Sequence, residues 1–376
     1  MRILHIVPAF YPNLYHGGLI VYNLCNALAR HDGIEVRVLT TDAAKAPGKK
    51  AAGDQCPIPT PLAYLVYYCR KRFAVSVAPG MLWHMAGLVR WADLVHLTEV
   101  YSFPSIPSLL VCRILRKPVV WSPHGALQRW EGSRRIALKA IWERVSRSIA
   151  PQRLLLQVTS EQEARESAER LPGVETAMVL HGVEIPDKVL PTTGNGVLRI
   201  LYLGRLDPIK GIENLLEACG LLNHSSSVSW SLTIAGAGDV RYSRSIRERI
   251  DKLGVSQQVI LLGEVTGESK EALFGNTDVL VAPSHKESFC MVVAEALAHS
   301  VPVIVSRGTP WQRVEKMRCG LWVDNAPESL AKAIEQMARM PRCEMGQRGR
   351  DWMQREFSWA QRASEMIDIY AELSRQ

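Results

Sequence analysis

The sequence lacks the patterns that mark several classes of protein. Its eight cysteines, at positions 25, 56, 69, 112, 219, 290, 319 and 343, form no C-x-x-C pair and no His/Cys cluster with zinc-ligand spacing. Such scattered cysteines favour reduced thiols in a cytosolic protein over disulfides or a metal site. No uninterrupted apolar run approaches the ~18–20 residues of a membrane span, and the chain begins with a strand-like run over residues 3–7. We therefore expect neither secretion nor integral membrane insertion.

The composition also excludes wholesale disorder and a solenoid. Hydrophobic residues make up 47% of the chain and charged residues 22%, which is ordinary for a folded α/β protein, and no internal repeat period is visible. At 376 residues the chain exceeds the ~250–300 at which a single core usually splits. We expect two domains.

The positive charge is concentrated in one segment. Residues 113–153 contain ten Lys or Arg but only Glu131 and Glu143, which accounts for the whole formal net charge of +8. Within it, residues 134–149 combine apolar positions at helical spacing (Leu138, Ile141, Trp142, Val145 and Ile149) with basic ones (Arg134, Arg135, Lys139 and Arg147). This amphipathic helix either packs on its own sheet or contacts anionic lipid or an anionic acceptor.

Strands and helices alternate in two series along the chain. The first series has predicted strands at 3–7, 36–40, 93–97, 118–122, 154–159 and 177–180, and helices at 19–30, 81–91, 104–115, 134–149 and 161–171. The second has strands at 198–203, 230–235, 258–262, 278–282 and 302–305, and helices at 211–222, 241–253, 268–275, 290–299 and 327–338. Residues 43–61 are typical of a loop or lid, 185–196 of a linker, and 351–374 of one or two final helices. This alternation predicts two doubly wound α/β domains facing each other across a cleft.

Two carboxylates bracket a turn in the second series. The stretch 283–297 follows a predicted strand and opens an Ala-rich helix, and open α/β sheets bind ligands at such strand ends. Glu287 lies in the loop, and Glu295 lies about two turns into the helix, about 9 Å farther along its axis. By themselves they fit either the acid/base pair of a hydrolase or two contacts to one elongated ligand.

Basic and glycine-rich turns follow other predicted strands. Arg205 and Lys210 flank the turn at 204–211, which suits a diphosphate but also fits a solvated Lys/Arg turn. The pair Gly17-Gly18 precedes a helix and allows an anion to approach backbone amides, although such pairs are commonly simple turns. His124 follows a strand and precedes a glycine, a place that fits a functional and a structural histidine about equally.

Together these stretches resemble the retaining glycosyltransferases of family 4, the glycogen-synthase-like group with the two-domain GT-B fold. The matching residues are Gly17-Gly18, Pro123-His124-Gly125, Gly204-Arg205-Leu206, Lys210-Gly211, Gly236-Ala237-Gly238, Pro283-Ser284, Glu287-Ser288-Phe289 and Glu295-Ala296. The last two form the E-x7-E signature of that family. The resemblance spans nearly the whole chain and is strongest to bacterial enzymes of lipopolysaccharide and exopolysaccharide biosynthesis.

The resemblance implies a domain plan. It has a Rossmann-like acceptor-binding domain at residues 1–184, a linker at 185–197, a Rossmann-like nucleotide-sugar domain at 198–355, and a C-terminal helix at 356–376 that packs back on the first domain.

It also implies roles for the matched residues. Arg205 and Lys210 would neutralise the donor diphosphate, Glu287 and His124 would contact the donor sugar, and Glu295 would bind the ribose. These four, Arg205, Lys210, Glu287 and His124, are the expected catalytic residues. The expected donor-binding residues are Gly17, Gly18, Gly204, Gly238, Val265, Ser288, Phe289, Cys290, Met291 and Glu295.

The implied activity is hexosyl transfer, with retention, from a UDP- or GDP-sugar to a glycan or a polyprenyl-diphosphate-linked glycan. The family needs no metal or other cofactor, and the chain contains no D-x-D pair. No nucleic-acid partner is expected. The expected location is the cytoplasm, at the inner face of the plasma membrane.

Two departures from the family pattern concern the sugar pocket. Cys290 stands where glycine is usual, and His181 replaces the usual asparagine of an Asn-Gly-Val turn. They leave the donor sugar open without removing a charged group. The alternatives are a nucleotide-sugar 2-epimerase of the same fold, which needs no acceptor, and a catalytically silent binding protein, against which the presence of Arg205, Lys210 and Glu287 argues.

Overall fold

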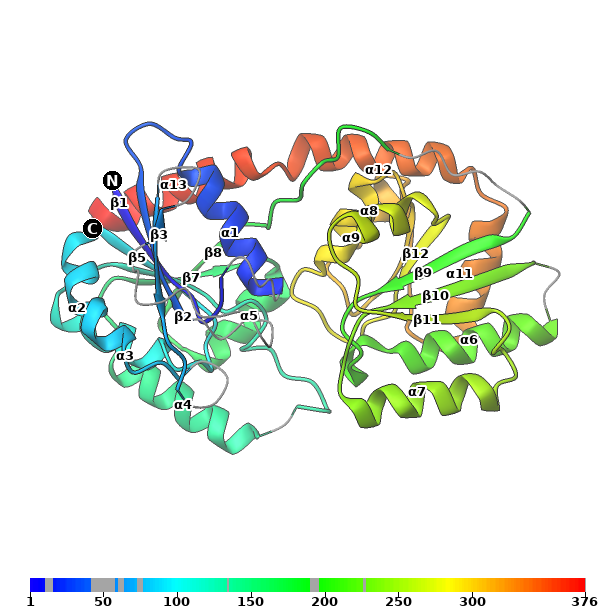
Figure 1. Cartoon of the computed structure of the whole chain (residues 1–376), viewed down its shortest axis with the longest axis horizontal. Coiled ribbons are helices and arrows are strands. Elements are labelled where there is room, and N and C mark those ends of the chain that lie inside the picture. The colour runs from blue at the N-terminus through cyan, green and yellow to red at the C-terminus, as the bar shows by residue number, and fades with distance from the viewer. Residues whose placement is uncertain are drawn as a thin grey trace. The chain divides into compact units, whose positions relative to one another are not determined.

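The structure is a computed structural model, shown in Figure 1, that describes residues 1–10, 16–41, 58–59, 64–72, 77–133, 135–189, 196–225 and 228–375. The chain divides into two compact units. The first unit comprises Met1–Gly182 with Trp359–Gln376, and the second comprises Val183–Ser358. Most of the predicted lid at 43–61 and the middle of the predicted linker lie outside the described residues.

An eight-stranded sheet in the order β3-β4-β2-β1-β5-β6-β7-β8 forms the centre of the first unit. The strands are β1 Arg2–Ile6, β2 Glu35–Thr41, β3 Ile58–Pro59, β4 Leu65–Cys69, β5 Leu94–Thr98, β6 Val119–Ser122, β7 Leu154–Val158 and β8 Glu175–Met178. Only β3 is antiparallel to its neighbour. Because β1 pairs in parallel with both β2 and β5, with Ile3 opposite Val36 and Leu94, the strand order reverses at β1.

Both faces of this sheet are covered by helices. The helices are α1 His16–Leu28, α2 Met81–Trp91, α3 Ser105–Ile114, α4 Ile136–Ser148, α5 Glu161–Arg170 and α13 Trp359–Arg375. Alternate residues of β1 enter opposite cores: Leu4 packs in the cluster with α2 and α3, and Ile3 in the cluster with α1 and α13. The C-terminal helix α13 thus returns to the first unit and packs along α1.

The second unit contains a six-stranded parallel sheet in the order β11-β10-β9-β12-β13-β14. The strands are β9 Leu198–Leu203, β10 Trp230–Ala235, β11 Val259–Gly263, β12 Val279–Ala282, β13 Val303–Ser306 and β14 Gly320–Val323. Strand β9 pairs with β10 on one side and with β12 on the other, so the strand order reverses between β9 and β12. Ligands of open α/β sheets bind at the carboxyl ends of the strands at such a reversal.

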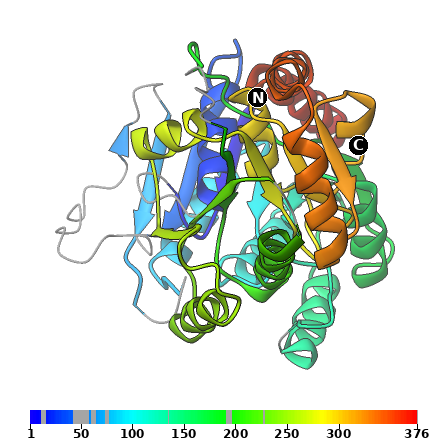
Figure 2. The ribbon, with the colours of Figure 1, turned by 90° about the vertical axis from the view of Figure 1, so that its right-hand side faces the viewer.

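Helices also cover both faces of the second sheet. They are the 3-10 turn η1 Pro208–Lys210 and the helices α6 Ile212–Ser225, α7 Val240–Lys252, α8 Glu268–Gly275, α9 Met291–Ala298, α10 Arg313–Lys316, α11 Pro327–Ala338 and α12 Arg342–Glu356. Helix α6 contacts α7 and α11, whereas α9 contacts α12. Figure 2 shows α11 beside α6 on one face of the sheet. Asp239 begins α7 by accepting hydrogen bonds from the backbone amides of Arg241 and Tyr242.

The prediction of two doubly wound α/β domains is confirmed, and most predicted elements occur within a few residues of their expected bounds. One strand and one helix of the second unit, β14 and α10, were not predicted, and α12 begins at Arg342, nine residues before the final helices predicted at 351–374. The first two are only four residues long, and Gly346 and Gly349 weaken the helix pattern of α12. No helix among the described residues has the length and apolar character needed to cross a membrane.

Candidate functional site

Two loops meet at the strand reversal of the second unit. The loop after β9 carries Lys210 and the loop after β12 carries Glu287, and the amide of His285 joins them by donating to the carbonyl of Ile209 at 2.8 Å. Gly211 allows this approach. It has φ +65°, and a Cβ there would lie 2.1 Å from the carbonyl oxygen of Pro283.

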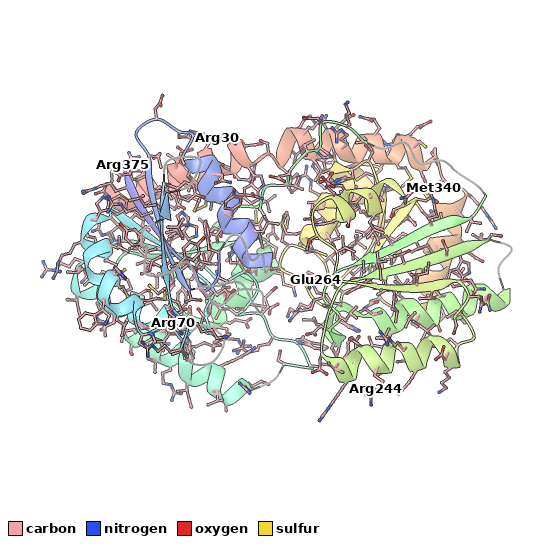
Figure 3. The ribbon with its side chains drawn as sticks, in the orientation of Figure 1. Arg30, Arg70, Arg244, Glu264, Met340 and Arg375 are labelled. Carbon is pink, nitrogen blue, oxygen red and sulfur yellow. The ribbon has the colours of Figure 1, made fainter. Side chains whose placement is uncertain are left out.

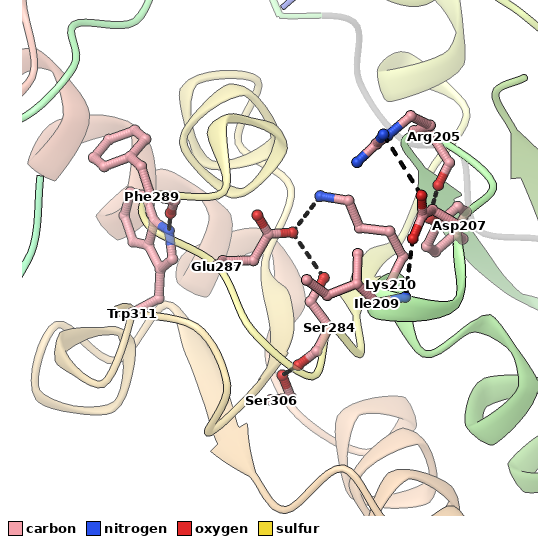
Figure 4. Close-up of polar contacts among 10 residues, drawn as sticks. Arg205, Asp207, Ile209, Lys210, Ser284, Glu287, Phe289, Ser306 and Trp311 are labelled. Atoms are coloured by element: carbon pink, nitrogen blue, oxygen red, sulfur yellow. Dashed lines mark hydrogen bonds and ion pairs between the residues drawn. The ribbon is translucent and has the colours of Figure 1, made fainter. Parts of the chain in front are cut away.

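The side chains of Lys210 and Glu287 form an ion pair across this junction (Figure 4). The ammonium of Lys210 donates to Oε1 of Glu287, and the hydroxyl of Ser284 donates to the same oxygen at 2.8 Å. Both side chains are largely buried, with 21% and 13% of their surfaces exposed. Burial is the largest single effect and lowers the pKa of Lys210, but the charge of Glu287, the nearby Cys290 and the hydrogen bond to Glu287 together outweigh it, so the net pKa is raised. Lys210 is therefore a cation at neutral pH.

The backbone around Glu287 is itself anchored. The amide of Glu287 donates to the carbonyl of Gly308 at 2.9 Å, and the hydroxyl of Ser306 donates to the carbonyl of Ser284. Strand β13 and the loop after it therefore hold the turn that presents the carboxylate (Figure 4).

Arg205 adds a second, more exposed cation. Its side chain is 61% exposed, and Nη1 lies 3.5 Å from Oδ2 of Asp207. The other oxygen of Asp207 accepts from the amide of Ile209 at 3.2 Å, which begins the turn η1. An exposed pair of this kind contributes little to stability, so Arg205 is available to an anionic ligand.

The turn before α9 has an unusual backbone conformation at Cys290. This residue has φ 67° and ψ 69°, in the left-handed region that favours glycine, and its side chain is buried. The indole of Trp311 donates to the carbonyl of Phe289, and their rings pack edge to face at 5.3 Å. Met291 begins α9, so the first amides of this helix lie next to Cys290.

Glu295, one to two turns into α9, is also paired with a lysine. Nζ of Lys270, from α8, donates to Oε1 of Glu295 at 2.6 Å, and the two side chains are 25% and 17% exposed. The two glutamates singled out in the sequence are thus each held by a different lysine in this structure.

The remaining predicted residues of the second unit lie in loops that follow its strands. Gly204 follows β9, Val265 follows β11 and is half-buried, and Ser288 lies between Glu287 and Phe289. Gly238 forms a parallel bridge with Leu206, so the loop after β10 packs against the loop that carries Arg205. Because all six strands are parallel, these loops share one edge of the sheet.

The other predicted residues belong to the first unit. Gly17 and Gly18 lie in the first turn of α1, where a Cβ on Gly18 would come within 2.9 Å of the carbonyl oxygen of Ala9. His124 follows β6 with φ 51°, and its ring stacks on that of His181 at 5.0 Å. The two histidines are therefore structural neighbours, a relationship that their separation in the sequence did not suggest.

Glu163, a residue not predicted to matter, holds the His124 loop. The sequence Ser160-x-x-Glu163 is a capping box, in which the glutamate would be expected to reach back to the cap. Its carboxylate instead accepts hydrogen bonds from the amide and the hydroxyl of Thr159, and from the amide of Gly125 at 2.5 Å. The capping box was a visible signal for Glu163, whereas nothing in the sequence marked Lys270.

A hydrogen-bonded histidine network lies beneath His124. His96 contacts Tyr370 OH at 2.5 Å through Nδ1 and Ser122 Oγ at 2.6 Å through Nε2. Ser122 donates to Gln157, so Nε2 of His96 donates to Ser122 and the neutral ring accepts from Tyr370. Burial lowers the pKa of His124 to about 4 and that of His5 to about 3.

This network borders a small cavity within the first unit. The cavity is lined by Ile20, Val21 and Leu24 of α1, by His96, Ser122, His124, Gln157, Val179, Leu180 and His181, and by Trp359, Arg362 and Met366 of α13.

Comparison with known proteins decides the family. Residues 17–185 match the family described as Glycosyltransferase Family 4, and residues 192–352 match the family described as Glycosyl transferases group 1. The chain belongs to the family 4 glycosyltransferases. The two matches fall on the two series of α/β elements, which agrees with the resemblance stated from the motifs.

Curated relatives match this family 4 chain over about half its length. It is 31% identical over 186 residues to an uncharacterized glycosyltransferase of Methanocaldococcus jannaschii, covering 46% of this chain and 44% of that protein. It is 30% identical over 183 residues to D-inositol 3-phosphate glycosyltransferase of Corynebacterium efficiens, covering 46% of this chain and 42% of the relative. The chain therefore spans less than half the length of these relatives.

Solved structures match the family 4 chain over nearly its whole length. Sucrose-phosphate synthase from Thermosynechococcus elongatus has a TM-score of 0.76 at 21% identity, covering 99% of this chain and 98% of that chain. HepE of Anabaena, solved in complex with UDP-glucose, has a TM-score of 0.74 at 16% identity, covering 99% and 100%. At these identities the likeness shows the fold alone, and it confirms the predicted GT-B architecture.

Proposed function

We propose that this chain is a retaining hexosyltransferase that moves a sugar from a UDP- or GDP-sugar to a glycan or lipid-linked glycan acceptor, in lipopolysaccharide or exopolysaccharide biosynthesis. The observation that carries the proposal is the pairing of Lys210 with Glu287 at the strand reversal of the second unit. Family membership supports it, as does the UDP-glucose bound by the structural neighbour HepE.

The charges suit departure of a nucleoside diphosphate. An acceptor hydroxyl oxygen bonds to the anomeric carbon while the bond from that carbon to the diphosphate oxygen breaks. The electron pair leaves with the diphosphate, and the acceptor proton passes to the departing phosphate. Lys210, held as a cation, and the exposed Arg205 would offset the negative charge that grows there, a role that a metal ion fills in other enzymes.

The carboxylates would bind the two ends of the donor. Glu287 would accept hydrogen bonds from the sugar and Glu295 from the ribose, with the amides at Phe289, Cys290 and Met291 near the sugar and phosphate. The anchored backbone around Glu287 supports this role, because a donor contact needs a carboxylate with a fixed direction. Each glutamate is held by a lysine, an arrangement that suits two contacts to one donor better than the acid/base pair of a hydrolase.

A screen of UDP- and GDP-sugars by thermal shift tests the proposal. A donor that binds the native state raises the melting temperature, and the strongest response identifies both the base and the sugar. The Lys210→Ala variant is expected to lose the response, whereas Arg307→Gln, which breaks an exposed pair with Asp324 and a contact with the Trp322 ring, is expected to keep it. If no nucleotide sugar shifts the wild-type protein, the proposal is wrong. Release of nucleoside diphosphate without any acceptor would favour the 2-epimerase instead.

A further inference from the structure

Helix α4 turns its apolar stripe toward solvent. Leu138, Ile141 and Val145 recur at i, i+3 and i+7, so they share one face, and they are 62%, 57% and 37% exposed. Of the two alternatives that the sequence left open for this helix, packing on its own sheet does not hold for these three residues. Only Trp142 and Ile149 of the predicted apolar set pack partly against the core.

Polar contacts on the opposite face set this orientation. Glu143, with 7% exposure, accepts hydrogen bonds from the hydroxyl of Tyr101 and the guanidinium of Arg129. Ser146 is 1% exposed, and Nζ of Lys139 lies 5.1 Å from the centre of the Tyr101 ring. Rotating the helix to bury its apolar stripe would break the buried Glu143–Arg129 pair, so the outward face is a fixed feature of the fold.

The neighbouring helix extends the exposed apolar area. Leu110 and Ile114 of α3 are 43% and 68% exposed, and α3 contacts α4. Nη1 of Arg113 donates to the carbonyl of Ser148 at 2.5 Å, which ties the ends of the two helices together. We call this the α3–α4 surface, and its residues are Leu110, Arg113, Ile114, Arg116, Arg135, Leu138, Ile141, Arg144 and Val145.

The charge of the α3–α4 surface narrows the choice of partner. Its four arginines are exposed, and of the two acidic residues between 113 and 153, Glu143 is buried and paired. Two copies of this surface would repel each other, which disfavours self-association. Nucleic acid would meet the arginines but would leave the Leu and Ile stripe without an apolar partner, because bases stack on aromatic rings. An anionic lipid surface satisfies both, with phosphates for the arginines and an acyl boundary for the stripe.

We propose that the α3–α4 surface docks this protein on an anionic membrane. Leu138, Ile141 and Val145 enter the boundary between headgroups and acyl chains, and the arginines contact lipid phosphates. Docking goes beyond the proposed transfer activity, because it requires neither donor nor acceptor, and it would place the protein where a lipid-linked acceptor resides.

Co-sedimentation with vesicles tests the docking. Vesicles of phosphatidylglycerol and phosphatidylcholine in equal parts are expected to bind the wild-type protein, and vesicles of phosphatidylcholine alone are expected to bind it much less. Arg135→Gln/Arg144→Gln should weaken binding about fivefold per cation removed. Leu138→Gln/Ile141→Gln should weaken it more than about tenfold, since both apolar anchors are lost. Each substituted side chain is exposed, so folding should persist.

A matched control removes the same charge elsewhere. Arg244 and Arg247 are exposed on α7 of the second unit, and Figure 3 shows Arg244 on the outer side of that helix. Arg244→Gln/Arg247→Gln should leave vesicle binding near the wild-type value. The proposal is overturned if this control weakens binding as much as Arg135→Gln/Arg144→Gln does, or if Leu138→Gln/Ile141→Gln binds as the wild type does. It is also overturned if the wild-type protein is a dimer in solution that the apolar variant dissociates, because the surface would then be a protein interface.

The outcome can be separated from that of the proposed function. All α4 variants should keep the thermal shift with nucleotide sugar, because none of their changed residues lies in the second unit. Vesicle binding by a protein that responds to no nucleotide sugar would reject the proposed activity and keep the docking surface. A thermal shift with nucleotide sugar but no vesicle binding would reject the docking surface and keep the proposed activity.

Discussion

The ammonium of Lys210 donates a hydrogen bond to Oε1 of Glu287, across 77 residues of sequence and two neighbouring strand ends. The lysine stays protonated because the charge and hydrogen bond of Glu287, together with the nearby Cys290, outweigh the effect of burial, which alone lowers the pKa of Lys210. A cation and an anion therefore lie side by side at the strand ends. Hydrogen bonds from Ser284 and to the carbonyl of Gly308 fix the position of Glu287.

Removing either member of this pair should slow the proposed transfer. A charged hydrogen bond left unmade in a closed site costs about 1.5–3 kcal/mol, or roughly tenfold or more in rate. We therefore expect Lys210→Ala and Glu287→Ala each to lower turnover by at least about tenfold, with the far-ultraviolet circular dichroism unchanged. Lys210→Arg keeps the charge and should retain more activity than Lys210→Ala. Wild-type turnover in both alanine variants would show that the pair has no part in the reaction.

The pairing of Lys270 with Glu295 predicts a different kinetic effect. Lys270 fixes the direction of a carboxylate that is proposed to bind the ribose, far from the reacting carbon. Lys270→Met should therefore raise KM for the donor, and the Kd of the nucleoside diphosphate measured by calorimetry, more than it lowers kcat.

The control for Lys270 is Glu268→Gln, on an exposed position of the same helix. It should change neither constant. An unaltered Kd in Lys270→Met would mean that Glu295 does not need this partner.

The left-handed backbone at Cys290 predicts an order of stability among substitutions. A non-glycine residue in this region costs roughly 1–2 kcal/mol, and a β-branched residue costs more. Cys290→Gly relieves the backbone strain but leaves a small cavity where the buried thiol was. Its free energy of unfolding should therefore stay within about 1 kcal/mol of the wild type.

Cys290→Val should be the unstable variant, by more than about 2 kcal/mol relative to Cys290→Gly in urea denaturation. Similar stabilities for the valine and glycine variants would mean that this backbone relaxes at little cost.

Buried histidines of the first unit predict an acid-sensitive fold. Burial lowers the pKa of His124 to about 4 and of His5 to about 3, whereas an unfolded histidine titrates near about 6.5. Below about pH 6.5 these histidines bind protons in the unfolded chain but stay neutral in the native protein. Their contribution to the free energy of unfolding is therefore complete above about pH 6.5 and is lost as the pH falls toward the pKa values of the folded state. Each such group contributes a slope of up to about 1.4 kcal/mol per pH unit.

His5→Leu should remove one of the protons taken up on unfolding, and so lower the pH dependence of the free energy of unfolding by up to about 1.4 kcal/mol per pH unit. Neither ring nitrogen of His5 has a hydrogen-bond partner among the described residues, so the substitution breaks no such bond. His84→Leu, at an exposed position on α2, is the control. The test compares the urea midpoint of each protein at about pH 7 and at about pH 5. If the midpoint falls equally in wild type and His5→Leu, His5 does not contribute to the acid sensitivity.

Much of the fold and part of the site could be predicted from the sequence. Apolar strands alternating with amphipathic helices are local patterns, and they determined the two doubly wound units and the position of Lys210 and Glu287 at strand ends. The motif match also marked Cys290 as a departure, and the structure supplies its meaning, because the position has the backbone conformation that glycine favours.

Only the tertiary structure decided which groups face one another. The pairing of Lys270 with Glu295, the stacking of His124 on His181 and the reach of Glu163 to Gly125 join segments that no local pattern links. Helix α4 shows the physical reason most clearly. Its periodicity determined that Leu138, Ile141 and Val145 share a face, but that face is exposed because Tyr101 and Arg129, from elsewhere in the chain, hold Glu143 inside. Helical spacing is set by the backbone, whereas the choice of the buried face depends on what the neighbouring elements present to it.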